Sequence, residues 1–223
     1  MPEFKDFYYP SSTGQNQIRA RICTPDTDGK AVVQISHGIS EHIERYDDFM
    51  RFLAEHGCIA VGNDHLGHGK SAARLDEIGI FADENGWDYV VRDMDALRDL
   101  VRRQYPDLPY IFFGHSMGSF LTRTYIIRYP DKYDAAILSG TGHQSAALVN
   151  GGYAAAQLLT KLNGPRSNGK ALNDMAFGSY CKKIPHPRTP FDWLSRDKET
   201  VDRYIADPMC GFVCKTSLYR DMM

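Results

Sequence analysis

The stretch Ile111–Phe120, IFFGHSMGSF, decides the fold of this chain. Three large apolar residues, typical of a buried strand, run directly into Gly-X-Ser-X-Gly, and apolar residues resume after it. This order predicts a strand at Tyr110–Phe113, a sharp turn at Ser116 and a helix over Ser116–Tyr129. The two glycines of the pattern allow the strand and the helix to approach each other closely. We therefore expect Ser116 to lie on a strained turn with positive φ, its hydroxyl exposed at the carboxyl edge of a sheet.

Strands and amphipathic helices alternate on both sides of this stretch, from about residue 30 to residue 140. Such alternation predicts an α/β fold, with a mostly parallel sheet and helices on both of its faces. The other predicted strands are Phe4–Tyr9, Gln17–Thr24, Ala31–Ile35, Cys58–Val61 and Ala135–Leu138. The other predicted helices lie at Tyr46–Leu53, stopped by Gly57, and at Val90–Val101, ended before Pro106.

The alternation stops after residue 142, and the rest of the chain is predicted to be helical and irregular. We interpret residues 1–142 as the core of the fold and residues 143–223 as a helical cap over the sheet, not as an independent domain. The short helices predicted in the cap are Tyr153–Leu162, Asp174–Cys181, Lys198–Ala206 and Phe212–Met223.

Composition narrows the class of protein. The chain has 223 residues, of which 43% are hydrophobic, and a formal net charge of −2. No basic stripe points to nucleic acid, and no polybasic run points to an anionic membrane. The N-terminus lacks the apolar segment of a secretion signal, and no apolar run approaches the roughly 20 residues of a membrane span. Five scattered cysteines indicate reduced thiols, so we expect a cytoplasmic protein.

The chemistry that this pattern favours is nucleophilic catalysis by Ser116. A tetrahedral intermediate at such a serine needs hydrogen-bond donors for its oxyanion. We expect one from the backbone N–H of Met117, directly after the serine, and one from Ile39, in the loop after the strand Ala31–Ile35. The alternative interpretations are a glycine-rich turn with an incidental serine and an ordinary loop glycine at Gly38.

Histidine-rich loops raise the question of a metal. His37 and His42 lie in one loop, and His65 and His68 in another, each directly after a predicted strand. The spacing of His65 and His68 is interrupted by glycines and fits no helical ligand pair. We expect no metal here, and we expect Asp64 and the glycines to build a tight turn that braces the site.

Three segments, HGISEH, DHLGHGKS and GHSMGS, in this order and at these separations, resemble the α/β-hydrolase superfamily. More narrowly, they resemble the monoacylglycerol lipase and lysophospholipase-like serine hydrolases, and the cap segment DPMCGF is similar to one in that family. The resemblance covers most of the chain. It implies an α/β-hydrolase fold, Ser116 as nucleophile, Ile39 and Met117 as oxyanion donors, and no cofactor.

The same resemblance implies carboxylic ester substrates, commonly monoacylglycerols or lysophospholipids, cleaved through an acyl-enzyme. Some apolar cap residues are expected either to line an acyl pocket beside the Ser116 turn or to form the cap's own core: Tyr153, Leu158, Leu159, Phe177 and Trp193. Transient contact of the cap with a membrane surface is compatible with such substrates. Neither acyl length nor oligomeric state is predicted.

The sequence after Ser116 offers no acid and no histidine at the places where this fold carries the other two residues of a catalytic triad. In this fold they follow the serine, each after a further strand. Past Ser116 only His143 and His186 remain, the first too early in the fold and the second in a proline-bound cap segment. We expect the sequence to stop inside the cap, with the sheet incomplete and both partners beyond Met223. This chain alone is then expected to be inactive.

Other functions remain open from the sequence. The chain fits a catalytically inactive binding protein that keeps the turn but not the reaction. It also fits a peptidase of the same fold, although we identify no anchor for an α-amino group. A metallohydrolase is the weakest of these alternatives.

Overall fold

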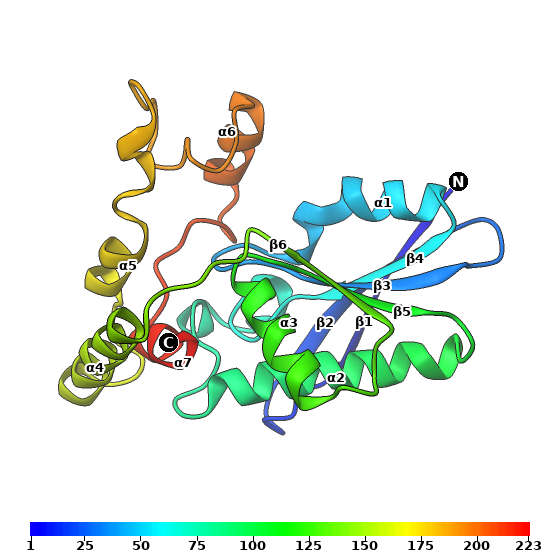
Figure 1. Cartoon of the computed structure of the whole chain (residues 1–223), viewed down its shortest axis with the longest axis horizontal. Helices are drawn as coiled ribbons and strands as arrows, with labels where there is room; N and C mark the ends of the chain where they lie inside the picture. Colours follow the sequence, from blue (N-terminus) through cyan, green and yellow to red (C-terminus); the bar gives the residue numbers. More distant parts are fainter.

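Six strands form one mixed sheet in the order β1-β2-β4-β3-β5-β6 (Figure 1). A computed structural model describes all residues, 1–223. The four strands from β3 to β6 run parallel, whereas β1 and β2 are antiparallel to their neighbours. The strands are β1 (Glu3–Pro10), β2 (Gln17–Thr24), β3 (Ala31–Ser36), β4 (Cys58–Asn63), β5 (Tyr110–His115) and β6 (Ala135–Ser139). The predicted α/β fold with a mostly parallel sheet is confirmed.

Helices cover both faces of the sheet, which explains why its central strands are continuously apolar. Helix α1 (Asp47–Glu55) lies on one face, and α2 (Gly86–Gln104) and α3 (Met117–Arg128) lie on the other (Figure 1). Successive residues of β3 point to opposite faces. Accordingly Val33 belongs to the smaller apolar core under α1, and Val32 to the larger core under α2 and α3.

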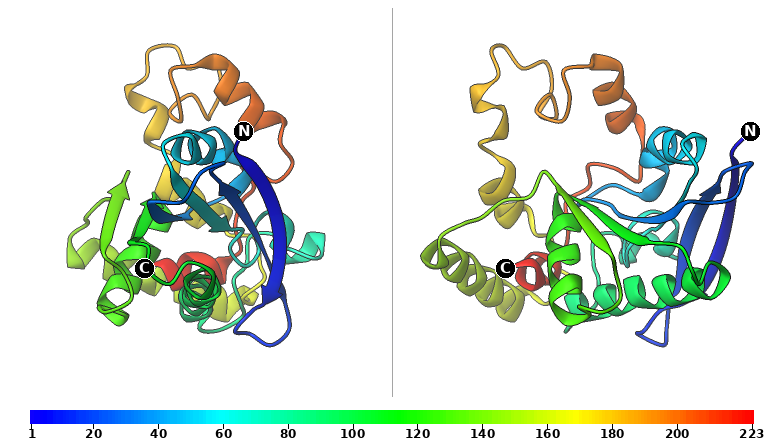
Figure 2. Two further views of the ribbon diagram at one scale, coloured as in Figure 1. Left: turned by 90° about the vertical axis from the view of Figure 1, so that its right-hand side faces the viewer. Right: turned by 45° about the vertical axis from the view of Figure 1, so that its right-hand side comes forward.

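The segment after β6 contains four helices, and Figures 1 and 2 show α4, α5 and α6 as an open arm beyond the edge where β5 and β6 end. These helices are α4 (Ala146–Asn163), α5 (Lys170–Phe177), α6 (Lys198–Ala206) and α7 (Thr216–Met222). None of the helices of the chain combines the length and the apolar character needed to span a membrane. Short 3₁₀ turns occur at Ile43–Tyr46, Gly69–Ser71, Leu75–Glu77 and Tyr180–Lys183.

Helix boundaries in this segment correct the sequence prediction. Helix α6 has the predicted bounds, but α4 begins seven residues earlier than the predicted start at Tyr153. Its start is set by Ser145, whose side chain accepts a hydrogen bond from the Leu148 amide. The helices predicted to begin at residues 174 and 212 begin instead at 170 and 216.

Helix α7 returns to the sheet domain and packs beside α2. Leu218 and Tyr219 are fully buried in the same apolar core as the helices α2 and α3. The Gly86 amide, at the start of α2, donates to the Asp221 carboxylate at 2.8 Å. One apolar core thus continues through residues 1–142 and residues 143–223. The interpretation of these two ranges as a core and a cap stays a prediction.

Strand β6 forms an edge of the sheet. It pairs only with β5, so its other side presents unpaired backbone groups. Ile137 and Leu138 are 51% and 36% exposed there. This is the exposed apolar edge expected when no further strand covers β6.

Candidate active site

Ser116 lies between the end of β5 and the first residue of α3, with φ 53° and ψ −121°. The predicted turn with positive φ is therefore present. Such a conformation costs a non-glycine residue about 1–3 kcal/mol unless its surroundings hold it. Here the Ser116 amide donates to the Ser139 carbonyl at 3.0 Å, and the Ser119 hydroxyl donates to the Ser116 carbonyl at 2.6 Å. The turn is thus held by β6 on one side and by α3 on the other.

The glycines of the pattern are required by close backbone contacts. A methyl group on Gly118 would collide with the carbonyl oxygen of Ser36 and would lie 2.5 Å from that of His37. A methyl group on Gly114 would collide with the carbonyl of Gly118 and lie 2.5 Å from the Thr122 hydroxyl. The absence of side chains therefore brings the start of α3 against the loop that follows β3.

That loop carries Ile39, the second expected oxyanion donor, and passes directly beside Ser116. A methyl group on Gly38 would lie 3.3 Å from the Cβ atom of Ser116. The Gly38 amide is already occupied, because it donates to the Glu41 carboxylate at 2.5 Å. The Ile39 amide, in contrast, donates to no acceptor in the chain.

The orientation of the Ile39 amide follows from a histidine tautomer. The His65 amide donates to Nε2 of His37 at 3.0 Å, so Nε2 is an acceptor and Nδ1 carries the proton. This Nδ1–H donates to the Gly38 carbonyl at 2.7 Å. In a planar trans peptide the C=O and the next N–H point in opposite directions, so this bond directs the Ile39 N–H away from His37.

Met117, the other expected donor, is the first residue of α3. First-turn amides of a helix have no intrahelical acceptor and lie at the positive end of the helix dipole. The structure thus brings Ser116, Met117 and the Ile39 loop together. This arrangement can hold negative charge beside the serine hydroxyl.

Three buried histidines lie behind this loop. The ring centroids of His37 and His65 are 4.1 Å apart, and those of His37 and His68 are 5.4 Å apart. Burial lowers the pKa of His65 to about 3 and that of His68 to about 4, and it holds the pKa of His37 well below its ordinary value. The lowered pKa values make the three rings weak bases, and their hydrogen bonds to Ser36 and to the carbonyls of Gly38 and Leu66 hold them as a packed cluster behind the loop.

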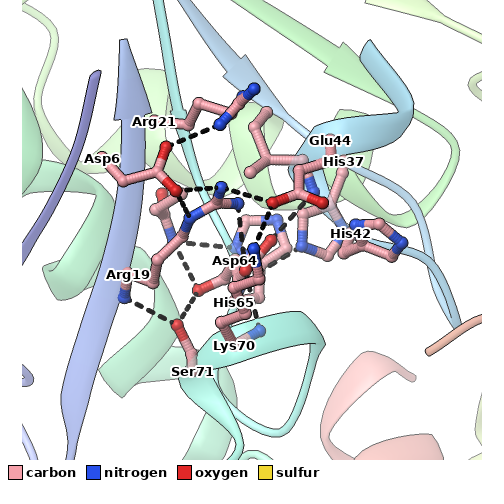
Figure 3. Close-up of polar contacts among 12 residues, drawn as sticks. Asp6, Arg19, Arg21, His37, His42, Glu44, Asp64, His65, Lys70 and Ser71 are labelled. Carbon is pink, nitrogen blue, oxygen red and sulfur yellow. Dashed lines mark hydrogen bonds and ion pairs between the residues drawn. The ribbon is translucent and has the colours of Figure 1, made fainter. Parts of the chain in front are cut away.

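A buried charge network fixes the far end of the loop (Figure 3). The Asp64 carboxylate accepts hydrogen bonds from the amides of Ile43 and Lys70, both at 2.9 Å. Arg19, which is fully buried, contacts Asp64 at 3.4 Å. Arg19 also pairs with the carboxylates of Asp6 and Glu44, at 2.6 and 2.7 Å. The prediction that Asp64 braces this turn is confirmed.

No base is hydrogen-bonded to the Ser116 hydroxyl. His143 and His186, the two histidines that follow Ser116 in the sequence, are exposed and make no side-chain hydrogen bond. His115, the residue before the serine, has its Nδ1 within 3.1 Å of the Ser139 hydroxyl. The proton of Ser116 thus has no acceptor side chain among these residues.

His42, Asp207 and Cys210 form the one group whose side chains resemble a metal ligand set, with potential ligand atoms all within 4.8 Å of one another. However, His42 Nε2 and Asp207 Oδ2 already form a hydrogen bond of 2.8 Å. Burial, together with the charge of Asp207, raises the pKa of the Cys210 thiol to about 12. Coordination would require this proton to leave and the bond to open, so the group fits a hydrogen-bonded contact better than a metal site.

The cavity beside the turn differs from the expected apolar pocket. It has a volume of about 210 Å³ and is lined by Glu41, Arg45, Tyr46, Phe113 and His115. Four of these five side chains, all except Phe113, carry a charged or titratable group, which favours polar ligands. Tyr153 and Leu158, expected inside the cap or along a pocket, are 42% and 57% exposed. For these two residues the expectation was wrong, because the side of α4 that packs against α7 carries Gly152, Ala156 and Thr160 instead. Leu159 and Phe177, in contrast, pack against the main apolar core.

Comparison with known proteins identifies the family. A sequence model of the family described as serine aminopeptidase, S33, matches residues 27–223. The chain belongs to this family of α/β-hydrolases. The curated relatives of this α/β-hydrolase include a monoacylglycerol lipase of Mycolicibacterium smegmatis, 32% identical over 199 residues, which are 89% of this chain and 63% of the relative. The human monoglyceride lipase is 27% identical over 219 residues, 96% of this chain and 63% of the relative.

Solved structures agree with this family. A thermostable carboxyl esterase from Bacillus coagulans, in complex with glycerol, superposes with a TM-score of 0.89 at 30% identity, over 98% of this chain and 71% of the esterase. A lipase in an open form superposes with a TM-score of 0.86 at 27% identity, over 99% of this chain and 72% of the lipase. The chain spans less than two thirds of the length of the curated relatives it matches, since it covers 63% of both lipases named above.

Proposed function

We propose that this chain supplies the nucleophile and the oxyanion hole of a serine ester hydrolase. The observation that carries the proposal is the strained turn at Ser116, which lies against a loop whose Ile39 amide has no acceptor. A backbone N–H without an acceptor in the chain is free to donate, and an anionic ligand beside Ser116 would satisfy it. In such a site each donor accelerates the chemical step by about 10²–10³-fold.

The reaction follows from this geometry. The Ser116 hydroxyl attacks the ester carbonyl, and the carbonyl oxygen takes up negative charge beside the Ile39 and Met117 amides. The alcohol then leaves and an acyl-enzyme remains, which water hydrolyses to the free acid. In the first step a base within about 2.6–3.2 Å of the serine hydroxyl takes its proton and gives it to the leaving alcohol, and in the second step the same base takes a proton from the attacking water. That base needs an acid to orient it.

We further propose that this acid and base are not among the 223 residues. Burial makes the three buried histidines weak bases, and their hydrogen bonds go to groups other than Ser116. The exposed His143 and His186 form no hydrogen bond with Ser116 either. The chain by itself is therefore expected to be a poor catalyst. Without triad partners, comparable enzymes retain a rate of only about 10³–10⁴-fold over water.

The proposed substrates are small-molecule esters of lipid-like acids, monoacylglycerols or lysophospholipids. The relatives are named as monoacylglycerol and monoglyceride lipases, which supports this class for a chain that matches them over most of its length. The acyl chain would approach from the open arm formed by α4 to α6.

A second candidate, favoured by the family's description, is an aminopeptidase. This reaction needs a free carboxylate near the serine to bind an α-amino group. Glu41 is the carboxylate in the cavity beside the turn, but it already accepts from the Gly38 amide and the Tyr46 hydroxyl and pairs with Arg45. The ester reaction is therefore the better-supported candidate.

Labelling with a fluorophosphonate probe and turnover of a short-chain nitrophenyl ester test the proposal. Both are measured on the 223-residue chain and on a longer product of the same gene where one is expressed, each beside its Ser116→Ala variant. We expect the longer product to label and turn over only when Ser116 is present. Turnover of the 223-residue chain at about 1–10³ per second, lost in Ser116→Ala, would show that the base lies within it. A longer product that neither labels nor turns over would support an inactive binding protein.

A further inference from the structure

Ser40, the residue after Ile39, is held by a part of the chain more than 160 residues away. Its φ of 55° lies in the left-handed region, where a serine is strained. The Ser40 carbonyl accepts hydrogen bonds from the Tyr204 hydroxyl at 3.0 Å and from the Gly211 amide at 2.9 Å. Its hydroxyl donates to the Phe212 carbonyl at 2.8 Å. Three bonds thus tie one strained residue to residues 204–212.

The Tyr204 side chain, which α6 contributes to this contact, is itself held by its neighbours. Tyr204 is buried, and its ring packs against Phe191 at 5.3 Å between centroids. The guanidinium of Arg45 lies 4.8 Å from the centre of the same ring. Gly211 has a φ of 68°, and a methyl group there would lie 3.2 Å from the Tyr204 ring. The Tyr204 hydroxyl is therefore held in place when it reaches the loop.

A second bond joins the same two segments. Nε2 of His42 lies 2.8 Å from Oδ2 of Asp207. Burial by itself raises the pKa of Asp207, but the bonds to His42 and to the Met209 amide outweigh this effect and hold it below its ordinary value. Residues 204–212 thus contact the Ile39 loop at Ser40 and again at His42.

Ile39 lies between two anchors. On one side Gly38 is fixed by His37 and Glu41, and on the other side Ser40 is fixed by residues 204–212. We infer that Tyr204 is a positioning residue, which through the Ser40 carbonyl keeps the Ile39 amide directed toward the oxyanion. This inference rests on the proposed function. It implies that the oxyanion hole is complete only when α6 is docked on the loop.

The test uses Tyr204→Phe, which removes one hydroxyl and keeps the ring between Phe191 and Arg45. The matched control is Asp202→Asn, on the same helix, which breaks an exposed ion pair with Arg188 and does not contact the loop. The first readout is the NMR amide resonances of Ile39 and Ser40. We expect them to shift or broaden in Tyr204→Phe and to stay in place in Asp202→Asn, with the resonances of α2 unchanged in both.

The second readout is kinetic and uses the longer gene product. It consists of the rate of fluorophosphonate labelling at Ser116, and of kcat and KM for a nitrophenyl ester. We expect Tyr204→Phe to lower both the labelling rate and kcat at least about tenfold and to leave KM unchanged, because oxyanion donors act mainly in the transition state. All rates are measured well below the melting temperature of the variant. A purely structural role would lower the melting temperature without this kcat effect.

The two readouts test the proposed hydrolase function and the positioning role of Tyr204 separately. If the longer product with its native sequence fails to label, the proposed function fails, and the Ile39 resonances alone decide the inference about Tyr204. Unmoved Ile39 and Ser40 resonances in Tyr204→Phe, or labelling as fast as in Asp202→Asn, would overturn it.

Discussion

The Cα atom of Gly118 lies so close to the carbonyl oxygen of Ser36 that a single methyl group between them would collide with it. This contact joins the start of α3 to the end of β3. It therefore sets the distance between the candidate nucleophile and the loop of its oxyanion donor.

Gly118→Ala should destabilise the fold. The added methyl meets backbone on two sides, so neither neighbour can turn away, and overpacking of this kind costs about 1–3 kcal/mol or more. The matched control is Gly151→Ala, within α4, where an added methyl group meets nothing within 4 Å. There we expect stabilisation of up to about 1 kcal/mol. Urea midpoints measure both, and equal midpoints would contradict the tight contact.

Arg19→Met should also destabilise the chain, for an electrostatic reason. It would leave Asp64 buried without its cation, and removing one partner of a buried ion pair costs about 3–5 kcal/mol. Arg74→Met is the control, because Arg74 pairs with Asp76 at the surface and such pairs contribute about 0–1 kcal/mol. The free energy of unfolding decides the matter, and a loss as small as that of Arg74→Met would refute the role given to Arg19.

Acid should destabilise the protein below about pH 6.5. Burial lowers the pKa of His65 to about 3 and that of His68 to about 4, whereas the unfolded chain binds these protons near pH 6.5. Between these values the unfolded state holds more protons, so the free energy of unfolding falls as pH falls. The slope is up to about 1.4 kcal/mol per pH unit for each histidine.

Urea unfolding at several pH values between about 7 and 4.5 measures this slope. We expect His68→Gln to reduce it by about one histidine's contribution, whatever its effect at pH 7. His56→Gln, at an exposed position outside the cluster, is the control. A slope unchanged by His68→Gln would mean that the histidine cluster is not the source of the acid sensitivity.

Strand β6 should make the 223-residue chain self-associate. Its free edge presents unpaired backbone groups beside Ile137, which is 51% exposed. A lysine at an edge opposes strand pairing, so Ile137→Lys should shift the population toward monomer in size-exclusion chromatography with light scattering. Ile127→Lys, on α3, changes an 81% exposed side chain away from any strand edge. If both variants dissociate the chain equally, general apolar contact and not edge pairing drives the association.

Much of the fold was predictable because its signals are local. The apolar run before Gly114 and the glycine at 118 predict a strand, a turn and a helix within one short stretch, and the structure has them there. Helix α6 has the predicted bounds, Lys198–Ala206, and in the structure Asp197 caps its first turn. The start of α4 was missed because the capping Ser145 lies eight residues before Tyr153, where the apolar pattern used to place the helix begins.

The sequence by itself determined the α/β architecture, the strained turn at Ser116 and the glycines that this turn needs. Each depends on the periodicity and conformational limits of residues that are neighbours in the chain. Only the tertiary structure decided which amide near Ser116 is free, because this depends on the His37 tautomer, and that depends on the distant His65 amide. It alone placed Tyr204 on Ser40. No sequence pattern marks a hydrogen bond between residues 164 positions apart, since this contact forms only when folding brings α6 against the loop after β3.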